Sequence, residues 1–213
     1  MSKKINIILV DDHAVVRAGV RRLLEQEPIF EVIGESDSGE KGYQIFGELN
    51  PDVMVMDLSM PGMGGLEAIR RILMRHNKAN ILVLSMHEDL SFANQALKLG
   101  VKGYLIKNTL GDDLVKSIQR IASGEIFLSD EIAKKIAVSS IDSNQDPIHE
   151  LSAREFEIFR FLAEGLEVDT IAVILNISSK TVSNYQTMIK QKLNISTPVE
   201  LIRYAIKEGV IKN

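Results

Sequence analysis

The chain has 213 residues, of which 45% are hydrophobic, and a formal net charge of -4. This length and composition suit two modest globular domains and exclude an intrinsically disordered protein. No apolar run approaches the length of a membrane span, and residues 1–6 lack the apolar region of a signal peptide, so we expect a cytoplasmic protein with no membrane partner. The absence of cysteine excludes disulfides, thiolate metal sites and cysteine nucleophiles.

Charge is distributed unevenly between the two parts of the chain. Residues 151–213 carry 8 Lys and Arg against 7 Asp and Glu, whereas residues 1–150 carry 17 against 22. The C-terminal part is therefore slightly basic and the N-terminal part acidic, which indicates that the two parts face different partners.

Residues 1–125 alternate short apolar runs with amphipathic segments. We predict strands at residues 5–10, 30–34, 53–56, 81–85 and 103–106. We predict helices at residues 14–26, 39–49, 66–76, 90–99 and 112–123. Strand-helix units joined by right-handed crossovers imply an α/β fold: a five-stranded, doubly wound parallel sheet with helices on both faces.

The chain changes character after residue 125. Residues 126–148 are predicted to be a linker with one short helix, because the stretch 139–147 is polar and ends at a proline. Residues 149–213 are predicted to form a small all-α domain. Its four helices are expected at residues 153–163, 168–175, 179–193 and 198–208. The tight connection at residues 175–178 is typical of a helix-turn-helix.

Acidic residues follow the first and third predicted strands. Asp57 ends the third strand, where the sequence PGMGG at residues 61–65 forces a loop, and Asp11 and Asp12 follow the first strand. These carboxylates are expected to converge at the carboxyl edge of the sheet, and their mutual repulsion requires a proton or a cation. Mg²⁺ suits such oxygen ligands, and one acid can then act as a nucleophile that accepts a phosphoryl group.

Two further side chains on the same edge fit this chemistry. Ser85 can donate its hydroxyl to a phosphoryl oxygen, and Lys107 can neutralise another. Each residue alone has a simpler explanation: Asp57 can be satisfied by turn amides, Asp11 and Asp12 can cap the next helix, and a lysine is usually a solvated surface charge. Their conjunction on one edge favours a phosphoryl-accepting site.

At these positions the chain resembles the receiver domain of bacterial two-component response regulators. The resemblance covers roughly residues 1–125 and is carried by ILVDDH at 8–13, VMDLSMPGMGG at 55–65, VLSMHED at 83–89 and GVKGYLIK at 100–107. It implies a flavodoxin-like domain phosphorylated by a histidine kinase. The implied roles are Asp57 as phosphoacceptor, Asp12, Asp57 and the backbone carbonyl of Ser59 as Mg²⁺ ligands, Asp11 in the acidic pocket, Ser85 and Tyr104 as switch residues, and Lys107 as phosphate partner.

The helix predicted at residues 179–193 has the composition of a DNA-recognition helix. Its candidate base and phosphate contacts are Lys180, Thr181, Ser183, Asn184, Gln186, Thr187, Lys190 and Lys192. Val182, Ile189 and Leu193 are expected to face the core. The alternative is a solvated helix in a protein-interaction module, because the domain is barely basic.

Residues 151–193 resemble the LuxR-type helix-turn-helix of the NarL/FixJ family. LSAREFEIF, IAVILNIS, KTV and IKQKL carry this resemblance, and the Ser-Asn-Tyr sequence at 183–185 is closer to the GacA/UvrY branch, whose members pair with hybrid sensor kinases. The resemblance implies a phosphorylation-activated transcription regulator that binds promoter DNA as a homodimer once its receiver no longer obstructs the recognition helix. The segment 198–208 is a candidate dimer helix or, alternatively, a core helix.

Two competing functions follow from the same residues. A Mg²⁺-dependent phosphohydrolase would use Asp57 as a transient nucleophile. Such enzymes usually place a second acid two residues later, where this chain has Ser59, so we expect no enzyme. A phosphorylation-dependent protein-interaction switch would keep the receiver but bind protein through its helical domain.

Overall fold

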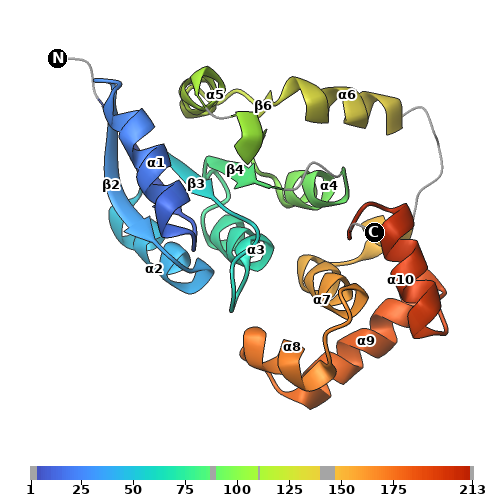
Figure 1. Ribbon diagram of the computed structural model, residues 1–213. Helices are drawn as coiled ribbons and strands as arrows, with labels where there is room; N and C mark the ends of the chain where they lie inside the picture. Colours follow the sequence, from blue (N-terminus) through green and yellow to red (C-terminus); the bar gives the residue numbers. More distant parts are fainter. Residues whose placement is uncertain (1–3, 87–89, 110, 140–146, 212–213) are drawn as a thin grey trace.

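The computed structural model describes residues 4–86, 90–109, 111–139 and 147–211 (Figure 1). Its N-terminal domain contains a six-stranded parallel sheet in the order β2-β1-β3-β4-β5-β6. The strands are β1 (Ile5–Val10), β2 (Phe30–Ser36), β3 (Val53–Met56), β4 (Ile81–Ser85), β5 (Gly103–Ile106) and β6 (Phe127–Leu128). The predicted doubly wound α/β fold is confirmed.

The prediction of five strands was wrong in number, because β6 extends the sheet beyond β5. The Phe127 N–H donates to the Lys102 carbonyl at 2.9 Å, and the Ser129 N–H donates to the Tyr104 carbonyl at 3.2 Å. Two residues are too few to establish an alternation of apolar and polar side chains, so the sequence pattern gave no sign of this strand. The start of the predicted linker therefore belongs to the sheet.

Helices cover both faces of the sheet (Figure 1). They are α1 (Ala14–Glu25), α2 (Gly39–Leu49), α3 (Gly65–Arg75), α4 (Leu90–Leu99) and α5 (Asp112–Ala122), and a 3-10 turn, η1 (Lys107–Thr109), follows β5. Helices α1 and α5 bury Leu24, Leu114 and Ile118 against one face. Helices α2, α3 and α4 cover the other face, so the carboxyl ends of the strands are left as the open edge of the domain.

The C-terminal domain is entirely helical, as predicted. Helix α6 (Asp130–Ser139) precedes it, and the predicted polar connection 139–147 lies mostly outside the described residues. The elements of the domain are η2 (Pro147–Glu150), α7 (Ala153–Ala163), α8 (Val168–Ile174), α9 (Ser179–Leu193) and α10 (Pro198–Lys207). Within the part of the chain that the structure describes, no helix is long and apolar enough to span a membrane.

Polar residues set the helix ends in this domain. The Ser152 hydroxyl accepts the N–H of Glu155, whose carboxylate in turn accepts the Ser152 N–H at 2.7 Å, forming a capping box at the start of α7. Ser178 caps α9 by accepting the Thr181 N–H, and Asn176 turns the chain between α8 and α9 in the left-handed region, at φ 50°. The predicted helix-turn-helix corner is thus formed by local hydrogen bonds.

Candidate functional site

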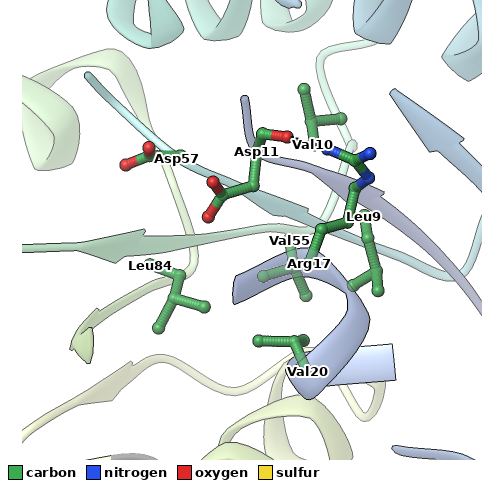
Figure 2. Close-up of a pocket in the computed structure, with 8 residues that line it drawn as sticks. All are labelled: Leu9, Val10, Asp11, Arg17, Val20, Val55, Asp57 and Leu84. Carbon is green, nitrogen blue, oxygen red and sulfur yellow. Dashed lines mark hydrogen bonds between the residues drawn. The ribbon is translucent and has the colours of Figure 1, made fainter. Parts of the chain in front are cut away.

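An acidic pocket lies at the carboxyl edge of the sheet, between β1 and β3. The register pairs Val10 with Met56, so the next residues, Asp11 and Asp57, emerge side by side. The Asp57 N–H donates to the Val10 carbonyl at 2.8 Å and fixes this position. Figure 2 shows the two carboxylates among the side chains that line the pocket, with Val20 and Leu84 below them in this view. Both acids are buried, with Asp57 only 2% exposed.

Lys107 brings a positive charge into the same pocket. It directly follows β5, and its ammonium nitrogen lies 2.7 Å from Asp11 Oδ2 and 3.0 Å from Asp57 Oδ2. Burial raises the pKa of Asp57 above its ordinary value, against the opposing effect of Lys107. Burial also lowers the pKa of Lys107, but the two carboxylates outweigh this effect and the net shift is upward, so the ammonium stays charged. The predicted convergence of these three side chains is present in the structure.

The oxygen atoms of the pocket fit a hard cation. One ligand atom each from Asp11, Asp12, His13 and Asp57 lies within 4.8 Å of the others. The buried Asp12 Oδ1 lies beside His13 Nδ1, and the buried Asp57 Oδ2 lies beside the Lys107 ammonium. Three carboxylates share one buried ammonium, and a divalent ion would offset the remaining negative charge. His13 is mostly exposed, with its Nδ1 2.9 Å from Asp12 Oδ1.

The simpler explanations for these acids fit the structure less well. His13, rather than Asp11 or Asp12, occupies the N-cap of α1, and its side chain makes no capping hydrogen bond. Asp11 Oδ1 accepts the His13 N–H at 2.8 Å, which orients the acid toward the pocket. The one turn amide that reaches Asp57 among the described residues is the Ser59 N–H, at 3.4 Å from Oδ1. Turn chemistry therefore leaves most of the Asp57 carboxylate available.

The two predicted switch residues lie inside the domain. Ser85 ends β4 opposite Ile106, and Tyr104 pairs with Val83; both Ser85 and Tyr104 are fully buried. The aromatic ring of Tyr104 is therefore in an inward position in this structure. Residues 87–89, which belong to the motif VLSMHED, lie outside the described residues.

The predicted DNA-contact residues differ in how α9 presents them. Lys180, Ser183, Asn184 and Thr187 are exposed, whereas Thr181, Gln186, Lys190 and Lys192 are partly buried. Val182, Ile189 and Leu193 are buried, so the expected inward stripe is confirmed. Lys192 pairs with Glu155 Oε2 at 2.7 Å inside its own domain, which reduces its availability for a phosphate. The geometry therefore favours the exposed set over Lys192 as a DNA-facing surface.

The structure also contains a contact between the two domains, and the residues that form it were not predicted. Phe92 on α4 meets Phe156 on α7 edge to face, with ring centroids 4.9 Å apart. The buried Gln95 amide donates to the carbonyls of Ile148 and Leu151, both at 3.2 Å. A signal for this contact is present in α7, whose apolar residues occupy every side of the helix, a pattern typical of a helix buried all round.

Family models match both domains. A model for the response regulator receiver domain matches residues 7–119, and a model for the bacterial regulatory proteins of the luxR family matches residues 149–205.

Individual relatives match over almost the whole chain. Response regulator UvrY of Escherichia coli (strain K12) is 38% identical over 208 residues, which are 97% of this chain and 95% of UvrY. Response regulator GacA of Pseudomonas viridiflava is 36% identical over 209 residues, which are 97% of this chain and 98% of GacA. The structure of RcsB from Salmonella enterica serovar Typhimurium, bound to promoter P1flhDC in the presence of phosphomimetic BeF3-, has a TM-score of 0.71 and 30% identity, and the match covers 95% of this chain and 98% of RcsB.

Proposed function

Since the chain belongs to the response regulators that join a receiver domain to a LuxR-type DNA-binding domain, it is a DNA-binding transcription regulator controlled by phosphorylation, and we propose that Asp57 is its phosphoacceptor. The observation that carries this proposal is the position of Asp57: a buried carboxylate at a strand end, 3.0 Å from the Lys107 ammonium. Lys107 holds this carboxylate in place and offers a positive charge to an incoming phosphoryl group.

In the proposed reaction a phosphohistidine of a sensor histidine kinase is the donor. An O–P bond forms at an Asp57 carboxylate oxygen while the N–P bond of the donor breaks, and the departing imidazole nitrogen keeps the electron pair and takes a proton from water. Asp11 and Lys107 fix the geometry of the acceptor. Ser59, two residues after Asp57, has no carboxylate to activate a water molecule, which favours a lasting phosphoryl group over turnover.

Asp12, Asp57 and the Ser59 backbone carbonyl are the proposed ligands of Mg²⁺. The clustering of three carboxylates around a single buried ammonium supports this assignment. The ion would supply positive charge that offsets the repulsion between the acceptor and the phosphoryl oxygens.

Phosphorylation would then be detected by Ser85 and Lys107. A phosphoryl group adds about 1.5 to 2 negative charges and three strong acceptor oxygens, which attract the hydroxyl and the ammonium. We propose that Tyr104, buried on β5 beside β4, acts as the aromatic switch, with phosphorylation favouring its inward position. We infer that this shifts the contact between the receiver and the DNA-binding domain.

The proposed DNA contacts lie on α9. Lys180 and Lys190 would hold phosphates, while Ser183, Asn184 and Thr187 would face base edges, with Thr181, Gln186 and Lys192 at the margin of the contact. The binding of RcsB to promoter DNA supports the assignment of this domain. We further propose that two copies bind a two-fold promoter site in the cytoplasm, under a sensor kinase of the hybrid type.

DNA-binding measurements with and without phosphorylation test this function. Fluorescence anisotropy on promoter fragments should show about tenfold tighter binding after treatment with a small phosphodonor and Mg²⁺, a typical allosteric coupling. Asp57→Asn should bind with the basal affinity in both conditions, whereas Asp37→Asn, an exposed acid, should respond as the wild type does.

Two results would count against the proposal. An equal response in Asp57→Asn would place the phosphoacceptor elsewhere. Affinity for DNA that does not fall with salt, or no binding in any state, would favour the protein-interaction switch instead, because phosphate contacts release counterions.

A further inference from the structure

The loop that follows the phosphoacceptor touches the DNA-binding domain directly. Within this loop, which connects β3 to α3, the Gly62 N–H donates to the carbonyl of Ile174, at the end of α8, at 2.9 Å. Gly64 lies against the carboxylate of Glu157 on α7, so closely that a Cβ at residue 64 would overlap it. Gly64 also has φ +70°, a backbone conformation that other residues rarely adopt. Gly62 and Gly64 thus form the part of the receiver loop that contacts the second domain.

Glu157 is an unusual residue for such a position. Its side chain is 9% exposed and pairs with Arg154 at 2.6 Å. Arg154 is shared, because its second terminal nitrogen donates to the Leu175 carbonyl at 3.0 Å. A carboxylate enclosed between two domains loses its hydration when the domains meet, and a single shared arginine offsets only part of that loss.

Charged groups face Glu157 from each neighbouring element. They are Arg154 and Arg160 on α7 and Glu67 on α3. Glu40 on α2 accepts the Met63 N–H of the glycine loop at 2.7 Å. Arg160 is engaged by Glu164, and Glu67 is engaged by Arg70 and Arg71. The surroundings of Glu157 therefore contain no basic group dedicated to it alone.

We propose that Glu157 is a proton-linked latch between the receiver and the DNA-binding domain: when protonated it seats against Gly64 and holds the domains together, and when ionised it favours their separation. This latch would make pH a second control, besides phosphorylation, on the contact between the two domains. It acts through the same loop, because Gly65, at the end of the loop, packs so tightly on the Asp57 carbonyl that no Cβ fits there. Proton binding at Glu157 and phosphorylation at Asp57 would thus both act on the contact between this loop and the DNA-binding domain.

The direction of the pH effect follows from the environment. Burial in the closed contact raises the pKa of Glu157 from an ordinary 4.5 to about 7, against the opposing effect of Arg154. In an open arrangement the carboxyl group is hydrated and its pKa returns toward the ordinary value. The closed state therefore binds more protons than the open state between these two pH values. Closure is favoured as the pH falls, and this contribution is lost as the pH rises through about 7.

Linkage gives the size of the effect. For a group with a pKa of about 7 in the closed state, the closed-to-open ratio rises about tenfold between pH 8 and pH 6. The consequence for DNA binding rests on the proposed function, in which the receiver restrains α9 in the closed state. A higher pH favours the open state, so less phosphorylation would then be needed for DNA binding.

Domain separation can be measured without DNA or phosphodonor. Because the chain has no cysteine, a Lys78→Cys, Ser196→Cys pair places one dye on an exposed site of each domain. Energy transfer within the full-length protein should report about a tenfold change in the closed-to-open ratio between pH 8 and pH 6, with the rise beginning as the pH falls through about 7. Glu157→Gln, which is neutral at every pH, should remain closed across this range.

Matched variants separate the latch from other titrations. Glu167→Gln removes an exposed carboxylate of the same domain and should keep the wild-type pH response. A pH response that survives in Glu157→Gln would belong to another group and would overturn the latch. Gly64→Ala should weaken closure at every pH, because its added methyl group displaces the Glu157 carboxylate at a backbone φ of +70°. A Gly64→Ala protein with the wild-type closure and pH response would also overturn the latch.

Failure here is distinguishable from failure of the proposed function. An energy transfer that is independent of pH in the wild type removes the latch but leaves phosphorylation and DNA binding untouched. A chain that closes with pH as expected but never binds DNA keeps the latch and refutes the DNA-binding proposal.

Discussion

Asp57 and Glu157 are two buried carboxylates, one in each domain, and burial raises the pKa of both. Asp57 shares its basic partner, Lys107, with a second acid, Asp11, and this whole set belongs to one domain. Glu157 lies against Gly64 of the other domain, so its surroundings include both domains. The cost of burying Asp57 is therefore a permanent property of the receiver, whereas the cost of burying Glu157 varies with domain contact. A cation or phosphoryl group can relieve the first, and a proton relieves the second.

Removal of the Lys107 ammonium should give the largest change in the unfolding free energy, because it acts on the acidic pocket around Asp57. Lys107→Ala leaves two buried carboxylates without a basic partner, and breaking a buried ion pair in this way costs about 3 kcal/mol. Urea unfolding in the absence of divalent ions should show this loss. Mg²⁺ should restore more stability to the variant than to the wild type, because a bound cation replaces the missing positive charge.

An exposed lysine provides the control for that experiment. Lys116→Ala on α5 should change the unfolding free energy by less than about 0.5 kcal/mol, with the Mg²⁺ response of the wild type. Equal Mg²⁺ responses in Lys107→Ala and Lys116→Ala would contradict the compensation of charge in the acidic pocket.

The two carboxylates also differ in how visible they are in the sequence. Asp57 follows a four-residue apolar run and precedes a glycine-rich loop, so its position at the sheet edge follows from local patterns alone. Glu157 sits inside the apolar sequence of α7, where a helical pattern gives no information about which distant loop will cover it. The same limit applies to Phe92 and Gln95, because contacts between domains depend on the arrangement of whole elements. Strand β6 was missed for another reason, its length of two residues.

Gln95 tests the domain contact independently of charge. Its amide is 4% exposed and serves two carbonyls across the interface, so Gln95→Ala leaves both carbonyls buried without this donor. This should weaken closure by about 2 kcal/mol, or roughly 30-fold in the closed-to-open ratio. Energy transfer in the dye-labelled chain should report this shift equally at pH 6 and pH 8, unlike the change in Glu157→Gln.

Lys98 offers a matched control on the same helix. It donates to the His149 carbonyl at 2.7 Å, but this hydrogen bond is exposed to water. Lys98→Ala should therefore shift closure by less than about 0.5 kcal/mol. If Gln95→Ala and Lys98→Ala behave alike, burial of the Gln95 hydrogen bonds does not determine the strength of the contact.

Substitution of Glu67 should give the smallest effect. Glu67 faces Glu157, but its pKa is lowered whereas that of Glu157 is raised. Burial raises the pKa of Glu67, but Arg70 and Arg71 outweigh this effect and the net pKa is lowered. Its ion pairs therefore stabilise the fold at neutral pH and are lost as the pH falls below the ordinary value of 4.5. Glu67→Gln should lower the unfolding free energy by about 1 kcal/mol at pH 7 and by less as the pH falls below 4.5, as measured by urea unfolding.

The same variant should also move the midpoint of the latch. The negative charge of Glu67 contributes to the raised pKa of Glu157, so its removal makes ionisation of Glu157 easier. The midpoint of the energy-transfer titration in Glu67→Gln should fall below that of the wild type, while Glu131→Gln on α6, an exposed acid far from α7, should leave it unchanged. An upward shift would mean that loosening of α3 outweighs the charge. A downward shift would show that the two carboxylates interact across the contact, as a latch built from charges on both domains requires.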